Sequence, residues 1–238
     1  MEDVQDRTAP VGRVVYKDLC ADVGDLDAAA AFFGPLLGLE ERYRRPAVLQ
    51  LGDGVDQHTL WLNLVPEART VKNRVHLDVD VASVDEVVAA GARVVDDSQP
   101  WTVLEHPEAG ELCAFPRAPE QLRRYRVSEL VVDCVDHLRV ATWWAERFGA
   151  TVRDDGEIAW FEGGDGPPWA MVFTSVPEPK TVKNRVHWDV DGSTTELLAA
   201  GATLLRAKDE EIGWDQLLDV EGNEFCVFAP EGEGSTAG

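Results

Sequence analysis

The chain has 238 residues, of which 45% are hydrophobic and 28% charged, a balance typical of a globular protein rather than a disordered one. Its 44 acidic residues outnumber 22 basic ones, giving a formal net charge of −22. Nucleic acids and anionic membrane surfaces are bound largely through Lys and Arg, so this charge argues against both as partners.

The chain also lacks the usual signs of membrane insertion or secretion. No apolar run approaches the roughly 20 residues that span a bilayer, and the N-terminal stretch MEDVQDRTAP has no apolar signal core. The four cysteines are scattered without a CxxC pair, which favours reduced thiols over a disulfide framework. We therefore expect a cytoplasmic protein, monomeric or homodimeric, whose partner is a small molecule.

The first predicted elements are a strand, a helix and further strands. Val14–Cys20 is a β-rich apolar run. Asp25 then stands as an N-cap ahead of apolar residues at helical spacing, and shorter β-like runs end in Leu60–Val65.

A second group of elements repeats this order. Arg74–Val81 is predicted as a strand, and Ser83 with Glu86 forms a capping box before a helix that ends at Gly91. A final strand is expected around Leu112–Phe115. The order is β-α-β-β-β twice.

The rest of the chain is a second copy of this unit. Thr70–His76 recurs letter for letter as Thr181–His187, and Val65–Glu67 recurs as Val176–Glu178 at the same offset. The elements expected in the second copy are strands at Val127–Cys134, Ala170–Val176, Arg185–Asp191 and Phe225–Phe228, with helices after Asp136 and Ser193.

The duplication predicts two domains, 1–119 and 120–238, joined through the segment RAPEQLRRY (117–125). Each copy holds two βαβββ modules, so we expect an α+β fold in which each copy forms its own sheet with helices outside.

Three segments resemble the vicinal oxygen chelate superfamily, which includes glyoxalase, bleomycin-resistance and extradiol-dioxygenase proteins. They are KNRVHLDV (Lys72–Val79), KNRVHWDV (Lys183–Val190) and DVEGNEFCVF (Asp219–Phe228). The resemblance is greatest to actinobacterial glyoxalase-like domains and covers residues 13–116 and 126–230. It implies that paired modules curl into cup-shaped mixed sheets. It also implies that metal-dependent members take a ligand, often His, from each first strand and a Glu from each last strand.

Strand alternation supports part of such a site. In the Arg185–Asp191 strand, Arg185, His187 and Asp189 share the polar face, which should line the cup. The resemblance places Glu129 on a first strand and Glu224 on a last strand, so the predicted catalytic and metal-binding set is His187, Glu129 and Glu224. In this family pattern the usual last-strand Glu falls on Cys226, so Glu224 is off-pattern.

The first copy offers a parallel set of His76, Asp18 and Glu111. The residues expected to bind the ligand are His76, Asp18, Arg185, Asp189, Trp160, Trp169 and Cys226. For the histidines the alternative is a structural role beside Asp or Arg, and for the KNR segments it is fixing the entry to the strand. His58, His106 and His137 have no counterpart in the other copy and are expected in surface or loop positions.

The two copies differ mainly in their tryptophans. Trp143, Trp144 and Trp188 are expected in the core, where they would replace smaller residues of the first copy. Trp160 and Trp169 flank an acidic, glycine-rich loop and are expected to border a cavity. This asymmetry and an intact terminal turn favour the second copy as the active one.

The leading functional hypothesis is a cup that binds a small aromatic or amphipathic molecule, by sequestration or by metal-independent catalysis. The alternative is a lyase, isomerase or dioxygenase that depends on a divalent metal such as Zn, Ni, Mn or Fe. A third hypothesis makes the first copy a scaffold for the second. The sequence leaves open whether the protein is an enzyme.

Overall fold

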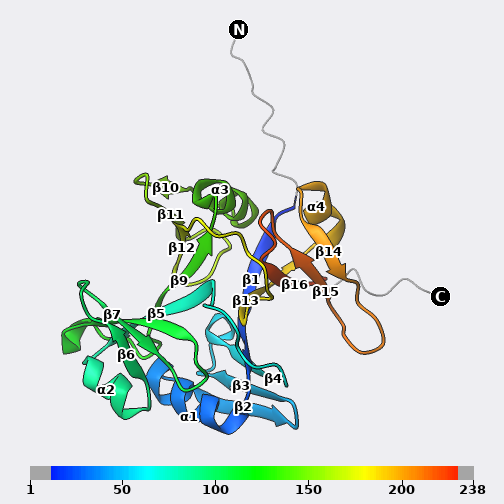
Figure 1. The fold of residues 1–238 in the computed structure, drawn as a ribbon. Helices are drawn as coiled ribbons and strands as arrows, with labels where there is room; N and C mark the ends of the chain where they lie inside the picture. The colour runs from blue at the N-terminus through cyan, green and yellow to red at the C-terminus, as the bar shows by residue number, and fades with distance from the viewer. Residues whose placement is uncertain (1–11, 230–238) are drawn as a thin grey trace.

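Figure 1 shows the fold of the computed structural model, which describes residues 12–229. The stretch MEDVQDRTAP, used above to predict location, lies outside this range. Among the described helices, none is long and apolar enough to cross a membrane.

Four consecutive βαβββ modules make up the described chain, which confirms the predicted α+β class. The first module contains β1 (Val14–Val23), α1 (Leu26–Leu37), β2 (Glu40–Arg45), β3 (Val48–Gly52) and β4 (Leu60–Leu64). The second contains β5 (Val75–Val81), α2 (Val84–Ala89), β6 (Arg93–Asp96), β7 (Thr102–Glu105) and β8 (Glu111–Pro116). The third contains β9 (Val127–Cys134), α3 (His137–Phe148), β10 (Arg153–Asp154), β11 (Ile158–Phe161) and β12 (Ala170–Ser175). The fourth contains β13 (Val186–Gly192), α4 (Thr194–Ala199), β14 (Thr203–Arg206), β15 (Asp215–Leu218) and β16 (Glu224–Phe228). Two short 3-10 turns, η1 (Asp56–His58) and η2 (Pro119–Gln121), complete the elements.

The modules combine across the two copies, which corrects the expectation of one sheet per copy. Sheet A has the strand order β14-β15-β16-β13-β1-β4-β3-β2 and joins the first module to the fourth. Sheet B has the order β10-β11-β12-β9-β5-β8-β7-β6 and joins the second module to the third. In each sheet the central contact is antiparallel, between β1 and β13 or between β5 and β9. Each sheet therefore takes one module from each sequence copy.

Two equivalent sets of contacts, one from each copy to the other, hold the modules in this exchanged arrangement. The loops 65–74 and 176–185 carry the chain from one sheet to the other. Lys72 Nζ lies 2.9 Å from Asp133 Oδ2 at the end of β9, and Lys183 Nζ lies 2.5 Å from Asp22 Oδ2 in β1. The backbone N–H groups of Asp22 and Asp133 donate to the carbonyl oxygens of Arg185 and Arg74, which extends both central pairings. The repeated KNR segment thus ties each copy to the first strand of the other.

The helices begin where their caps predict. The Asp25 carboxylate accepts from two backbone N–H groups at the start of α1, and Asp136 accepts from Arg139 N at the start of α3. Ser83 and Ser193 cap α2 and α4.

The second copy's tryptophans fill the core, as expected for three of them. Trp144 and Trp188 are fully buried and Trp143 is 7% exposed. Their rings meet each other and Phe225 edge-on. The helix-covered face of sheet A is therefore apolar, so the polar residues of β1 and β13 lie on its other face.

Candidate functional site

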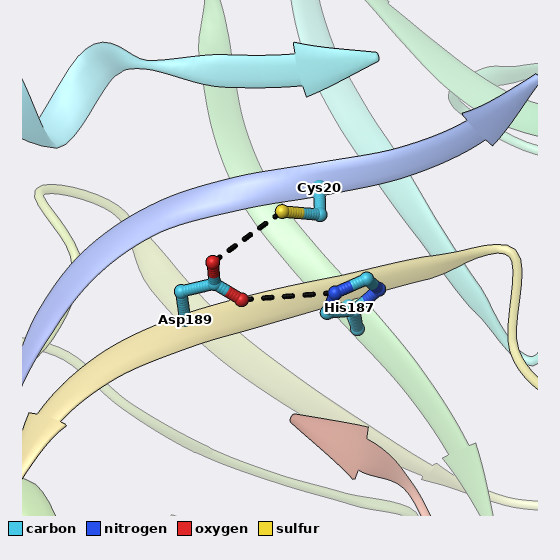
Figure 2. A group of neighbouring side chains, drawn as sticks. All are labelled: Cys20, His187 and Asp189. Carbon is cyan, nitrogen blue, oxygen red and sulfur yellow. Dashed lines mark hydrogen bonds and ion pairs between the residues drawn. The ribbon is translucent and has the colours of Figure 1, made fainter. Parts of the chain in front are cut away.

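Cys20, His187 and Asp189 form a compact cluster at the centre of sheet A (Figure 2). Cys20 lies on β1, and the other two lie on the neighbouring β13. His187 Nε2 is 3.6 Å from Asp189 Oδ1, and the Cys20 thiol is 3.5 Å from Asp189 Oδ2. Cys226 of β16 adds a fourth group, with its Sγ 3.6 Å from His187 Nε2. We call these four residues the A cluster.

The A cluster is buried and incompletely satisfied. Cys20, His187, Asp189 and Cys226 are each 4–8% exposed. Within the described chain, His187 Nδ1 and Asp189 Oδ1 lack a hydrogen-bond partner, as does Asp18 Oδ1 beside them. Buried polar atoms without partners are costly, so this cluster is a candidate site for a bound group.

Asp18 lies beside the A cluster, next to Asp189. It stands opposite Asp189 in the β1–β13 register, and the Trp61 indole donates to its Oδ2 at 3.1 Å. Burial is the main cause that raises the pKa of both Asp18 and Asp189, and the charge of Asp18 raises the pKa of Asp189 further. Two buried carboxyls in contact retain a proton more readily than separate ones.

Burial also keeps the other donors uncharged. It lowers the pKa of His187 to about 4, so this imidazole is neutral near pH 7. It raises the pKa of the Cys20 and Cys226 thiols, with the Asp189 carboxylate as the next cause. A neutral imidazole is the form that binds a metal, whereas the thiols need a cation to release their protons.

Sheet B holds the equivalent B cluster, made of His76, Asp78 and Cys113. His76 Nε2 lies 3.5 Å from Asp78 Oδ1 and 3.6 Å from Cys113 Sγ. The position that matches Cys20 is Val131, which stands opposite His76 in the β5–β9 register. The B cluster therefore has three donors where the A cluster has four.

Glu129 lies beside the B cluster. It pairs with Asp78 across β5 and β9, so the two side chains share one face of sheet B. Its pKa is raised, chiefly by burial and next by the Asp78 charge. A carboxyl with a raised pKa next to possible ligands is suited to handling a proton.

The predicted set of His187, Glu129 and Glu224 is not brought together. His187 and Glu224 lie on the paired strands β13 and β16 of sheet A, whereas Glu129 lies on β9 of sheet B. Glu224 is held by Lys180 Nζ at 2.6 Å and by the backbone N–H of Asn184. It thus anchors the loop that enters β13.

The parallel set of His76, Asp18 and Glu111 is divided in the same way. His76 and Glu111 lie in sheet B, and Asp18 lies in sheet A. Because the modules pair across copies, each first-strand carboxylate lies beside the histidine of the other copy.

Trp160 and Trp169 do not border the cavities found. Trp169 is 5% exposed, meets Tyr16 edge-on at 5.5 Å and donates to the Tyr125 hydroxyl. Trp160 lies on β11, and neither tryptophan lines the two cavities described below. Trp169 belongs to the core between the sheets.

Two residues near the sites were not assigned to a site from the sequence. Cys20 lies midway between Asp18 and Asp22 on β1, so all three share one face of the strand. This run of polar residues at every second position is the signal that could have identified Cys20. His106 was expected in a surface or loop position, and it lies in the loop between β7 and β8, where its ring stacks on Phe32 and meets Phe33 edge-on. Burial lowers the pKa of His106 to about 4.

Two cavities lie near these residues. The smaller, about 20 Å³, is lined by His76 and His106 among others and has room for about one water molecule. The larger, about 970 Å³, lies between the loops 65–74 and 176–185, and Arg185 is among the residues lining it.

Comparison with known families shows what this architecture is similar to. A family model described as a glyoxalase-like domain matches residues 18–115 and 129–228. The two matched segments follow the sequence repeat, one in each copy. The comparison with curated proteins found no significant match.

Solved structures share the fold. Glyoxalase I from Zea mays has a TM-score of 0.66 at 12% identity, with 90% of this chain and 92% of that chain covered. A putative dioxygenase from Bacillus subtilis has a TM-score of 0.61 at 10% identity, with 93% of this chain and 86% of that chain covered. At such identities the likeness shows the fold alone.

Proposed function

The chain belongs to the family of glyoxalase-like domains, and on this premise we propose that it holds a divalent transition metal and acts on a small oxygen-bearing molecule. The observation that carries the proposal is the gathering of His, Asp and Cys donors at matching places in both sheets. It favours the metal-dependent alternative over metal-independent binding.

The A cluster fits a metal by distance. Ligands bound tetrahedrally to zinc, at about 2.0–2.3 Å from the ion, lie roughly 3.3–3.8 Å from one another. The donor atoms of His187 and Asp189, of Cys20 and Asp189, and of Cys226 and His187 are 3.5–3.6 Å apart. Cys20 and Cys226 lie on strands that flank β13 on either side. The Cys20 thiol lies within 4.8 Å of the donors of both His187 and Asp189, and the Cys226 thiol lies 3.6 Å from His187 Nε2. A bound ion would also give Asp189 Oδ1, which lacks a hydrogen-bond partner among the described residues, a group to bind.

The donor types select among metals. Thiolate and imidazole ligands favour zinc and other softer transition metals, whereas Mg, Ca and Mn prefer oxygen. Of the metals considered from sequence, manganese fits least well and zinc best.

The B cluster is the better candidate for chemistry. Structural zinc sites are usually closed by four protein ligands, whereas catalytic sites have three and keep a position for water or substrate. With Val131 in place of a fourth donor, His76, Asp78 and Cys113 match the second pattern. This shifts the proposed reactive centre from the second copy to a sheet shared by both.

The protein residues have distinct roles in this proposal. A bound metal would supply Lewis acidity toward two neighbouring oxygens of a substrate. His76 and Cys113 would hold it through Nε2 and Sγ. Glu129 would hold or accept a proton at its carboxyl, because burial and Asp78 favour its protonated form. A proton-handling carboxyl beside a metal suits isomerase or lyase chemistry.

Elemental analysis of untagged protein tests metal binding. We expect near-stoichiometric zinc at each cluster, with His187→Ala and His76→Ala each removing one equivalent. Cys134→Ala is the matched control, since Cys134 is a buried thiol outside both clusters. A chain that remains metal-free after incubation with zinc contradicts the proposal.

Turnover distinguishes the reaction classes. The zinc-loaded protein should convert members of a panel of hemithioacetals and α-hydroxy ketones without consuming oxygen. Glu129→Gln should lower kcat at least a hundredfold while zinc content is retained. Oxygen consumption with catechols would indicate a dioxygenase instead.

A further inference from the structure

A cleft of about 970 Å³ contains none of the donors of the two metal-ligand clusters. Its walls are the loops 65–74 and 176–185, one from each copy, together with Asp22 and Asp133. The letter-for-letter repeat of TVKNRVH therefore places two identical segments around one space. We call this space the loop cleft.

The loop cleft is basic although the chain is strongly acidic. The net charge of the chain is −22, but the cleft is lined by six basic and four acidic residues, so its own balance is positive. Four of the basic side chains are balanced by carboxylates: Arg69 by Glu105, Lys72 by Asp133 and Glu111, Lys180 by Glu224, and Lys183 by Asp22. The remaining two are Arg74 and Arg185.

These two arginines keep unused charge and donors. Arg74 donates to the carbonyl oxygens of Asp133 and Glu178, and Arg185 donates to the carbonyl oxygen of Glu67. Within residues 12–229, neither forms an ion pair with a carboxylate. A guanidinium has five N–H donors, so most donors of Arg185 and several of Arg74 remain available. Two half-buried, uncompensated guanidinium groups at one cleft attract an anion.

The other walls show what the anion should look like. Val65, Val71, Val176 and Val182 line the same cleft, together with Pro66 and Pro179. The volume lies within the roughly 300–1,000 Å³ of small-molecule sites. A charged head alone would leave the apolar walls without a partner.

We propose that the loop cleft binds a small amphipathic organic anion, a carboxylate or phosphate ester, whose head is recognised by Arg74 and Arg185 and whose apolar part packs on the valines. This site is distinct from the proposed metal centres and contains none of their donors. Its test therefore uses zinc-stripped protein, so that its failure is separate from failure of the metal proposal.

Calorimetric titration at low ionic strength, with phenyl phosphate, benzoate and neutral benzamide as probes, tests the site. We expect saturable binding of at least one anion, weaker as salt rises, and at least tenfold tighter than binding of benzamide. The tighter of the two anions identifies the head as phosphate or carboxylate. Arg74→Gln and Arg185→Gln should each weaken binding at least tenfold.

A second variant guards against unfolding, since both arginines also hold the loops together. Val71 and Val182 are 44% and 42% exposed and line the cleft. Val71→Glu with Val182→Glu should abolish anion binding without removing a loop contact. Val88→Glu, at a 43% exposed valine of α2, is the matched control and should bind as the parent does. No saturable anion binding by the folded parent, equal binding of benzamide, or unchanged binding by the double glutamate variant overturns the proposal.

Discussion

Cys20 of the first copy stands directly opposite His187 of the second in the antiparallel pairing of β1 with β13. The equivalent pair in sheet B is Val131 and His76. The two sheets thus differ by one donor at an otherwise matching place. The proposed metal sites should differ accordingly.

Cys20→Val should make the A cluster resemble the B cluster. Removing one of four donors should weaken zinc binding at this cluster at least tenfold and leave the His76 site unchanged. Competition with a chromophoric chelator measures both affinities. The reciprocal variant Val131→Cys should tighten the B site and, by closing its open position, lower any turnover. If Cys20→Val leaves both affinities unaltered, Cys20 is not a ligand.

The ion pair between Lys183 and Asp22 should stabilise the pairing of the copies. Asp22 is 8% exposed, so Lys183→Met leaves a buried carboxylate without its cation. We expect a loss of about 2 kcal/mol in the free energy of unfolding, measured with urea. Adding Asp22→Asn to this variant should restore part of the loss.

An exposed ion pair is the control for that measurement. Arg44 and Asp27 are 39% and 83% exposed and lie 2.7 Å apart, and Arg44 also pairs with the exposed Glu41 at 2.8 Å. Arg44→Met should cost less than about 0.5 kcal/mol. Equal losses in the two variants would argue against a special role for the KNR segment.

The sequence predicts local features of this fold better than its long-range pairing. Capping by Asp25 and Ser83 depends on a few neighbouring residues, so spacing alone reveals it. The strand parity that put His187 and Asp189 on one face is local for the same reason.

Which module pairs with which is decided by distant contacts. Nothing near Glu129 in the sequence shows that it will face Asp78 rather than His187, because both pairings satisfy the same alternation. The exchange depends on contacts such as Lys72 with Asp133, which become visible only when the loops are placed. Each predicted ligand set is therefore divided between the two sheets, while His76 and His187 each lie in a cluster of donors, and their roles stay predictions.

Gly38 should be the least replaceable glycine of the first helix. It ends α1 with φ 72°, and a Cβ there would lie 1.9 Å from the carbonyl oxygen of Arg124. Gly38→Ala therefore combines left-handed strain with a backbone clash, and we expect a loss of at least about 3 kcal/mol in urea unfolding. Gly156→Ala is the matched control, since φ is 92° but the Cβ would meet nothing within 4 Å. It should cost only about 1–2 kcal/mol.

His106 should make the stability of the protein depend on pH. Burial against Phe32 and Phe33 lowers its pKa from 6.5 to about 4. Above pH 6.5 the residue is neutral in both the folded and the unfolded chain and carries no penalty. As the pH falls below 6.5, the unfolded chain takes up a proton that the folded chain refuses, so stability is lost until the pH reaches about 4. Between pH 7.5 and 5 this amounts to about 2 kcal/mol.

The difference between parent and His106→Gln isolates this contribution. Other groups also titrate in this range, including His187, but they are common to both proteins and cancel in the difference. Glutamine does not titrate, so the free energy of unfolding of the variant should fall by about 2 kcal/mol less than that of the parent between pH 7.5 and 5. Working above pH 5 also keeps the protein clear of its isoelectric point near 4.5, where loss of net charge promotes association. Parallel pH profiles would mean that the His106 imidazole protonates equally well in the folded and unfolded chains, and that its ring is not shielded by α1.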